Sequence, residues 1–287
     1  MEKAPRRCLP LACVAVAACL FSSAPLLPAP RLVYAAQSAP SASATTVVAL
    51  SREEQARFLE HAAIVRTRPV SKGVTGTLRA TLSDGTLTHD ASIQSVDDYK
   101  AVFQSAKSSE IAFRDTWRYN VAAYQLSLLL GVADLVPVTI ERRHQGKDAS
   151  FTWWVDEVLM DEGERLKKNL SSPDPETWRK ELRVVRIFDQ LIANVDRNMG
   201  NMLIDRGWHI WMIDHTRAFR RNEELKNEKA LSRCDPALLQ ALKRLTAEQL
   251  EKSLGRWLRP EEIKPMLARR DHIVAFFEKS VTVGATF

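Results

Sequence analysis

The chain has 287 residues, of which 45% are hydrophobic and 26% charged, with 10 glycines and 13 prolines. This composition excludes collagen-like, disordered and multi-span membrane proteins, and the length suffices for one large domain or two small lobes. Half of the formal net charge of +6 falls in residues 1–36. The basic total is therefore a poor argument for nucleic-acid binding, and we expect no nucleic-acid partner.

The first 36 residues have the pattern of a signal peptide. A positive region that contains Lys3, Arg6 and Arg7 precedes a long uncharged run, and 33–35 supply the small residues of a cleavage site. A transmembrane anchor is the alternative, although four prolines in the uncharged run over 8–30 argue against a continuous helix. In a third alternative the segment is a lipoprotein leader, because 16–19 resemble a lipobox that ends at Cys19.

We therefore expect an exported protein, periplasmic or extracellular. It would be membrane-bound only if the leader is retained or Cys19 is lipidated. Three of the four cysteines lie in the leader, so removal of the leader leaves Cys234 alone and excludes an intrachain disulfide. We expect Cys234 to be a buried or capping thiol, because no histidine lies near it in the sequence.

The first half of the body is rich in predicted strands. A Ser/Ala/Pro/Thr linker at 37–50, expected to be disordered, precedes a capping box at Ser51 and Glu54 that opens a helix reaching about Ala63. Strands are predicted over 77–82 and 86–96 around a hairpin turn at 83–85. The pattern then predicts a helix over 114–130 that ends at Gly131, followed by strands over 136–141 and 151–160.

The second half is predicted to be mostly helical. A helix begins near Pro175, a hairpin follows over 202–204 and 209–213, and later helices begin at Pro236, after Thr246 and at Pro260. This order predicts a two-lobed α+β architecture, with a strand-rich N-lobe over 51–163 and a helix-rich C-lobe over 164–287.

Three oxygen-bearing side chains follow the first long helix of this second half. Asp196 and Asn201 lie five residues apart, and Asn201 and Asp214 lie on the two arms of the predicted hairpin. Facing side chains of an antiparallel pair lie about 5 Å apart, so Asn201 and Asp214 could share one hard cation such as Mg²⁺. Asp196 could accept a proton from an attacking hydroxyl or orient it. The alternative is a purely structural role, in which a loop aspartate after a helix serves only as a cap or turn residue.

Polar neighbours of these three residues are expected to support the loop. Arg197 is expected either to pair with Asp214 or to brace the loop. Asp189 and Asn194 are expected to hydrogen-bond the loop without reacting, and His215 is expected to be a structural neighbour.

The motif at 196–201, Asp-Arg-Asn-Met-Gly-Asn, resembles the catalytic loop of phosphoinositide-kinase-like and HipA-like kinases. The four-jointed type of secretory-pathway kinase is related to them. Residues 119–126, with 130–131 and 136–137, are similar to the helix of these kinases and its exit. The resemblance spans roughly 72–219, although only these short motifs are specific.

The resemblance implies a two-lobed, protein-kinase-like fold that binds ATP with Mg²⁺ or Mn²⁺. It implies transfer of a phosphoryl group to a hydroxyl of a protein or small molecule, with Asp196 as the base and Asn201 and Asp214 as metal ligands. Gln94 and Asn120 stand where the family has its phosphate-binding Lys and the Glu that pairs with it. A neutral amide pair thus replaces an ion pair and removes a cation from the phosphates.

The missing cation leaves two replacement candidates, Lys72 and Lys100. It also favours the alternative function, an exported pseudokinase that binds nucleotide or acts as a scaffold without catalysis, since ATP is scarce outside the cytoplasm. The set Asp196, Asn201 and Asp214 favours the enzyme. A metal-dependent phosphohydrolase would need more metal ligands than the sequence offers.

Overall fold

The computed structural model describes residues 50–70, 76–104, 109–194 and 197–282. The predicted leader, including Cys19, and the predicted linker apart from Leu50 lie outside the described residues, as do Lys72 and Asp196. Within the described ranges, no helix combines the length and the apolar character that crossing a bilayer requires.

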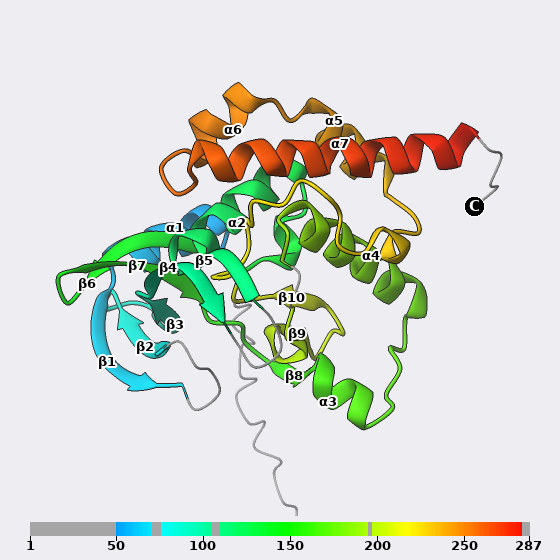
Figure 1. The fold of residues 1–287 in the computed structure, drawn as a ribbon. Helices are drawn as coiled ribbons and strands as arrows, with labels where there is room; N and C mark the ends of the chain where they lie inside the picture. Colours follow the sequence, from blue (N-terminus) through cyan, green and yellow to red (C-terminus); the bar gives the residue numbers. More distant parts are fainter. Residues whose placement is uncertain (1–49, 71–75, 105–108, 195–196, 283–287) are drawn as a thin grey trace, which may run out of the picture. The chain divides into compact units, whose positions relative to one another are not determined.

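A five-stranded antiparallel sheet forms the first half of the body (Figure 1), in the order β1-β2-β3-β7-β6. Its strands are β1 (Ala63–Pro69), β2 (Leu78–Ser83), β3 (Thr88–Gln94), β6 (Thr139–His144) and β7 (Lys147–Trp153). Apolar residues alternate along β2 and β3, and the pair Ala80 and Ala91 is fully buried. The alternation gives one apolar face to the core and leaves the opposite face polar.

Two helices pack against this sheet. Helix α1 (Arg52–His61) begins at Ser51, whose hydroxyl accepts from the Glu54 N–H while the Glu54 carboxylate accepts from the Ser51 N–H. The predicted capping box is thereby confirmed. Helix α2 (Arg118–Leu130) ends, as predicted, at Gly131, which has a φ of +70° that glycine adopts without steric cost.

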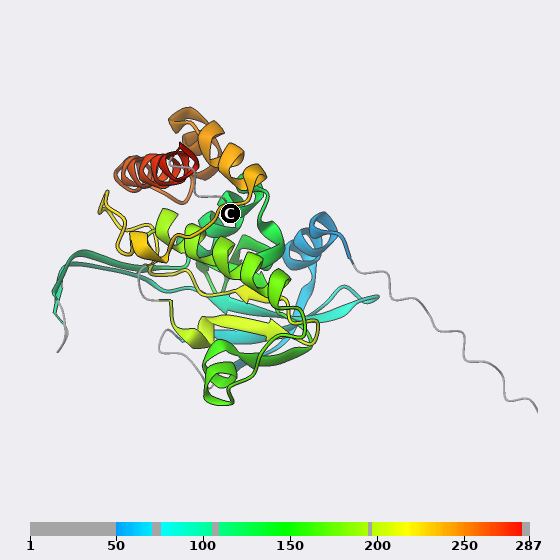
Figure 2. The same ribbon diagram turned by 90° about the vertical axis from the view of Figure 1, so that its right-hand side faces the viewer.

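A long hairpin between β3 and α2 was not predicted. It consists of β4 (Asp97–Gln104) and β5 (Ser109–Thr116), and Figure 2 shows it projecting away from the five-stranded sheet. The prediction of a helix over 114–130 is wrong at its start, because residues 114–116 belong to β5. The buried residues of α2 begin only at Tyr119, so the helical pattern starts later than predicted.

The single strand predicted over 151–160 is also wrong. The chain leaves β7 after Trp153 and enters a different sheet as β8 (Val158–Asp161). There β8 pairs with β9 (Met202–Asp205), which pairs with β10 (Ile210–Met212). The predicted hairpin is thus confirmed, and residues 154–157 connect the two sheets.

Helices dominate the rest of the chain. They are α3 (Glu162–Lys167), α4 (Pro175–Leu191), α5 (Pro236–Arg244), α6 (Ala247–Leu254) and α7 (Pro260–Thr282), with 3₁₀ turns η1 (Ala133–Leu135), η2 (Met199–Asn201) and η3 (Glu228–Ala230). The predicted starts of α4 to α7 are confirmed. Helix α7 packs against α4, α5 and α6. The predicted α+β layout, with a strand-rich half followed by a helix-rich half, is confirmed, while the lobe boundary at 163/164 stays a prediction.

Candidate functional site

The open end of the β9–β10 hairpin brings together the segments that hold Asn201 and Asp214. Met202 pairs with Met212, and the Ile213 N–H donates to the Asn201 carbonyl at 3.0 Å. Asp214 follows directly with a φ of +55°, in the left-handed region that residues other than glycine rarely adopt. The chain therefore turns sharply at Asp214 as it leaves the hairpin.

Arg197 braces the loop that precedes this hairpin. Its Nε and Nη2 donate to the Asp189 carboxylate at 2.7 and 2.8 Å, and the Asn194 amide donates to the same carboxylate at 3.0 Å. Nη1 of Arg197 donates to the carbonyls of Asn201 and Ile213 at 3.2 and 3.3 Å. The bracing role expected for Arg197 is observed, and so are the expected hydrogen bonds of Asp189 and Asn194.

Gln94 and Asn120 form a buried amide pair between the sheet and α2. Gln94 is the last residue of β3, and Asn120 lies in the first turn of α2. The Asn120 Nδ2 group donates to Gln94 Oε1 and, at 3.2 Å, to the Ser150 hydroxyl. Both residues are buried, since Gln94 is 5% exposed and Asn120 is 4% exposed. The pair is thus a neutral, hydrogen-bonded link, which agrees with the amide pair predicted from the sequence.

This pair continues to the segment after β10. Gln94 Nε2 donates to Asp214 Oδ1 at 3.3 Å and to the Thr77 hydroxyl at 3.1 Å. The Asn120 Oδ1 atom accepts from the His215 N–H at 2.7 Å. Three elements distant in sequence, β3, α2 and the exit of β10, therefore meet at one point. We call Gln94, Asn120, Asp214 and the His215 backbone the amide network.

The His215 side chain is structural, as expected. It is 2% exposed and lies edge-on to Phe188 with ring centroids 6.1 Å apart. Burial, together with the positive charge of Arg197, holds the pKa of His215 well below its ordinary value. The imidazole is therefore neutral near pH 7 and packs in the core beside the network.

Asp115 is a carboxylate of this region that the sequence did not indicate. It lies near the end of β5 and is 8% exposed. Burial raises the pKa of Asp115; a hydrogen bond with Thr216 opposes that rise, and the charge of Asp214 adds to it. The Thr216 hydroxyl also donates to Asp214 Oδ1 at 3.1 Å. No sequence signal marked Asp115, because its hairpin was not predicted.

Lys100, one of the two candidate replacement cations, is directed into the β4–β5 hairpin. Its Nζ atom lies 5.1 Å and 5.8 Å from the ring centroids of Phe103 and Phe113. The other candidate, Lys72, lies outside the described residues. Cys234 is half-buried, and burial raises the pKa of its thiol to about 12, which agrees with the expectation that it is not a nucleophile.

The donor set of the region suits a hard cation held jointly with phosphate. Within the described part of the chain, no group of three or more His, Cys, Asp or Glu side chains could hold a metal by itself. One carboxylate, Asp214, and one amide, Asn201, offer hard oxygen atoms, and Mg²⁺ is commonly held by one or two such groups plus substrate phosphates. The hydrogen bonds from Gln94 and Thr216 fix the Asp214 carboxylate through its Oδ1 atom.

Comparison with solved structures shows that the chain has the atypical kinase-like fold predicted from the sequence. No family model matches the chain, and no curated protein matches its sequence. Hydra Fam20, solved with a sugar, superposes with a TM-score of 0.60 at 14% identity over 82% of this chain and 90% of its own. The Golgi casein kinase, solved with Mn/ADP bound, gives 0.55 at 14% identity over 82% and 77%. The Helicobacter pylori proinflammatory kinase CtkA gives 0.53 at 10% identity over 80% and 99%.

Proposed function

We propose that this chain, which has an atypical kinase-like fold, is a phosphotransferase. It would move the terminal phosphoryl group of ATP, bound with Mg²⁺ or Mn²⁺, to a hydroxyl of a protein or small molecule. The observation that carries the proposal is the convergence of Gln94, Asn120 and Asp214, from three separate elements, at one buried point. These residues were assigned to one nucleotide site from sequence motifs alone, and their meeting supports that assignment.

Asn201 and Asp214 are the proposed metal ligands. A divalent cation held there neutralises charge on the phosphates as it develops in the transition state. Support comes from the Golgi casein kinase, a structural neighbour with Mn/ADP bound. Asp214 is oriented by Gln94 and Thr216, and the Asn201 carbonyl is tied to Arg197 and Ile213. Both ligands are therefore attached to a braced backbone.

Asp196 is the proposed base. The acceptor hydroxyl oxygen would form a bond to the terminal phosphorus while the bond from that phosphorus to the bridging oxygen breaks. The hydroxyl proton would pass to the Asp196 carboxylate, and ADP would be the leaving group. Arg197, the next residue, is anchored to Asp189. In-line transfer depends on the position of the base, and Asp196 itself lies outside the described residues.

Gln94 is proposed to replace the phosphate-binding lysine with an amide donor. Its Nε2 group already bonds Asp214 and Thr77, so a phosphate oxygen would compete with these acceptors. Lys72 remains the proposed additional cation. We also propose export through the leader at 1–36, with membrane attachment only if the leader is retained or Cys19 is lipidated; the Golgi location in the name of one neighbour agrees with kinases working outside the cytosol.

A pseudokinase is the second candidate, and the neutral Gln94–Asn120 pair favours it. A buried pair that lacks both charges is not a damaged ion pair, because no lone charge remains. It does withhold a positive charge from the phosphates. Such a protein would bind nucleotide and metal without transferring phosphate.

The test separates binding from transfer. Thermal unfolding is measured with ATP, with Mg²⁺ or Mn²⁺, and with both, in the wild type, in Asp214→Ala and in Asp271→Ala, an exposed carboxylate on α7 that serves as the control. We expect stabilisation that needs nucleotide and metal together, is lost in Asp214→Ala and persists in Asp271→Ala. No stabilisation in the wild type would contradict the site.

Transfer is then followed with ATP labelled in its terminal phosphate. We expect Asp196→Asn to bind nucleotide like the wild type but to transfer phosphate at least about 100-fold more slowly, since general-base catalysis contributes factors of that order. Binding without transfer to any acceptor, in the wild type too, would replace the enzyme with the pseudokinase.

A further inference from the structure

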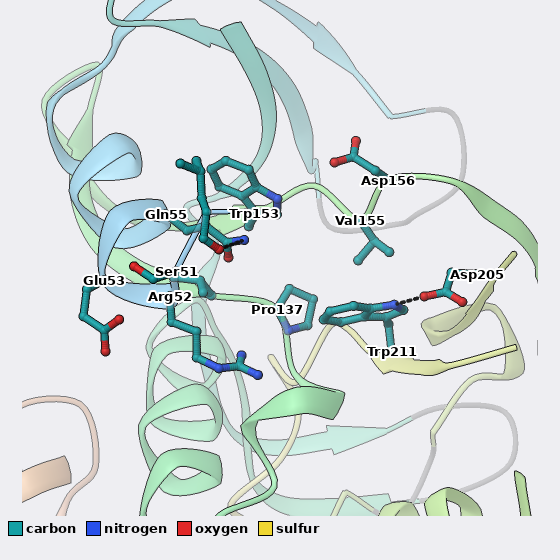
Figure 3. A pocket seen from close by; sticks show the side chains of 12 residues that line it. Ser51, Arg52, Glu53, Gln55, Pro137, Trp153, Val155, Asp156, Asp205 and Trp211 are labelled. Carbon is teal, nitrogen blue, oxygen red and sulfur yellow. Dashed lines mark hydrogen bonds between the residues drawn. The ribbon is translucent and has the colours of Figure 1, made fainter. Parts of the chain in front are cut away.

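A recess lies away from the amide network. It has a volume of about 610 Å³ and is bounded by the start of α1, the residues after β7 and the β9–β10 hairpin (Figure 3). Trp153, one of its lining residues, pairs with Ala91 across the sheet, whereas Gln94 pairs with Ser150. Successive strand residues face opposite sides, so Trp153 and Gln94 point to opposite faces of the sheet. We call this recess the rear pocket.

Two indole rings line the rear pocket, and both are held in place. Trp153 stacks on His89 with ring centroids 3.7 Å apart and meets the edge of Phe58 at 5.7 Å. The Trp211 Nε1–H group donates to Asp205 Oδ2 at 3.0 Å. Figure 3 shows both indoles at the pocket wall together with Val155. Because these rings are fixed before any ligand arrives, little conformational entropy is lost on binding.

Negative charge exceeds positive charge around the rear pocket. Glu53, Asp156 and Asp205 contribute carboxylates to its lining, and Arg52 contributes the one guanidinium. The Arg52 guanidinium is engaged elsewhere, since it donates to the Ala133 carbonyl at 2.8 Å and pairs with Asp134. Asp156 is held by His89 Nε2, which lies 2.7 Å from its Oδ2 atom.

We propose that the rear pocket binds a small organic cation, a quaternary or protonated amine with apolar substituents. An indole face attracts a cation through its quadrupole, and the surrounding carboxylates complement the charge. The apolar walls formed by Trp153, Trp211 and Val155 match the substituents, whereas an anion would face the acidic residues of the lining. The proposal does not depend on phosphoryl transfer, because none of the lining residues belongs to the amide network.

The test uses the full chain and two probes of similar size. Tetramethylammonium is titrated while tryptophan fluorescence and heat of binding are followed, and tert-butanol serves as the neutral isostere, with NaCl matching the ionic strength. We expect saturable binding of tetramethylammonium that is about tenfold or more tighter than that of tert-butanol, the order of a desolvated cation–π contact. Equal affinity for both probes, or no saturation by tetramethylammonium, would overturn the proposal.

Variants locate the binding. Asp156→Asn removes a charge from a side chain that is 65% exposed, so its folding is not at risk, and Trp211→Leu removes one indole. We expect each to weaken tetramethylammonium binding by about tenfold, whereas Glu248→Gln, an exposed carboxylate on α6, leaves it unchanged. Undiminished binding in both variants would overturn the proposal, as would competition by MgATP, which would place the cation at the amide network instead.

Discussion

Two of the junctions between the strand-rich half of the chain and the helical half have opposite chemistry. The amide network joins β3 and α2 to the exit of β10 through neutral groups that end on Asp214. A second junction joins η1 to α4 and the β9–β10 hairpin through His209. Its Nδ1 atom lies 2.7 Å from Glu181 Oε1, and its Nε2 atom lies 2.8 Å from the Asp134 carbonyl oxygen. Glu181 Oε2 also accepts from the Ile210 N–H at 2.8 Å.

The contrast indicates a division of roles. In the amide network a neutral amide, Gln94, holds Asp214, and no competing cation is needed to support this proposed metal ligand. The His209 junction keeps its charges for itself, because donor and carboxylate satisfy each other within the protein. Gln94 and Thr216, which hydrogen-bond Asp214, are thus neutral, whereas His209 pairs with a carboxylate. The predictions below test this contrast.

The largest expected effect concerns the charged brace behind the amide network. Arg197 and Asp189 have side chains only 9% and 12% exposed. Arg197→Met leaves the Asp189 carboxylate buried without its main partner, and we expect it to lower the free energy of unfolding by about 3–5 kcal/mol, measured by urea denaturation. The matched control is Arg179→Met. Arg179 pairs with Glu176 on α4, and the two side chains are 61% and 57% exposed, so we expect this variant to lower the free energy of unfolding by less than about 1 kcal/mol.

The double variant Arg197→Met/Asp189→Leu sharpens this prediction. It removes both charges, so we expect it to be more stable than Arg197→Met alone. If the double variant is no more stable than the single one, the loss comes from the carbonyl contacts to Asn201 and Ile213 rather than from an uncompensated charge.

A smaller effect is expected within the neutral network. Asn120→Leu keeps the volume of the side chain similar but leaves Gln94 Oε1 and the His215 N–H without their partner. We expect a loss of about 1–3 kcal/mol in the free energy of unfolding, less than for Arg197→Met, since no lone charge is created. Gln125→Leu, on the same helix, should change stability by only about 0.5 kcal/mol. A loss for Asn120→Leu equal to that for Arg197→Met would remove the contrast between the two kinds of support.

Features that depend on a few neighbouring residues could be predicted from the sequence. The capping box at Ser51, the helix start at Pro236 and the hairpin before Asp214 all form within short segments, so their spacing is visible in the chain. The meeting of Gln94 with Asp214 is long-range. It could be anticipated only through resemblance to kinases, because nothing local relates β3 to the exit of β10.

Other features had no local signal. Strand β1 is exposed along most of its length and forms through its pairing with β2, so it lacks hydrophobic alternation. The β4–β5 hairpin is similarly exposed along β4. Because the hairpin was not predicted, Asp115 on β5 was not recognised as a candidate residue. Arg269, 0% exposed, donates to the carbonyls of Leu191 and Arg220, and burial lowers its pKa to about 10. An arginine in a sequence is expected at the protein surface. Only the folded structure shows the backbone carbonyls that hold the buried Arg269 guanidinium.

The smallest expected effect is a pH dependence at the His209 junction. Burial opposes the charged form of His209, but hydrogen bonds to Glu181 and to the Asp134 carbonyl, with the nearby carboxylate charges, raise its pKa above the ordinary 6.5. A raised pKa means that the folded protein binds the proton more tightly than the unfolded chain does. The resulting stability is fully present below pH 6.5 and is lost as the pH rises through the folded pKa.

His209→Gln should therefore be most destabilising at about pH 5.5 and least at about pH 9, measured by urea denaturation across that range. His215 does not produce this trend, because its lowered pKa stabilises the fold above pH 6.5 and that stability is lost as the pH falls. His272→Gln, an exposed histidine on α7, is the control and should give a small difference at every pH. If the cost of His209→Gln does not vary with pH, the junction is held by its hydrogen bonds alone, and both junctions are then neutral in effect.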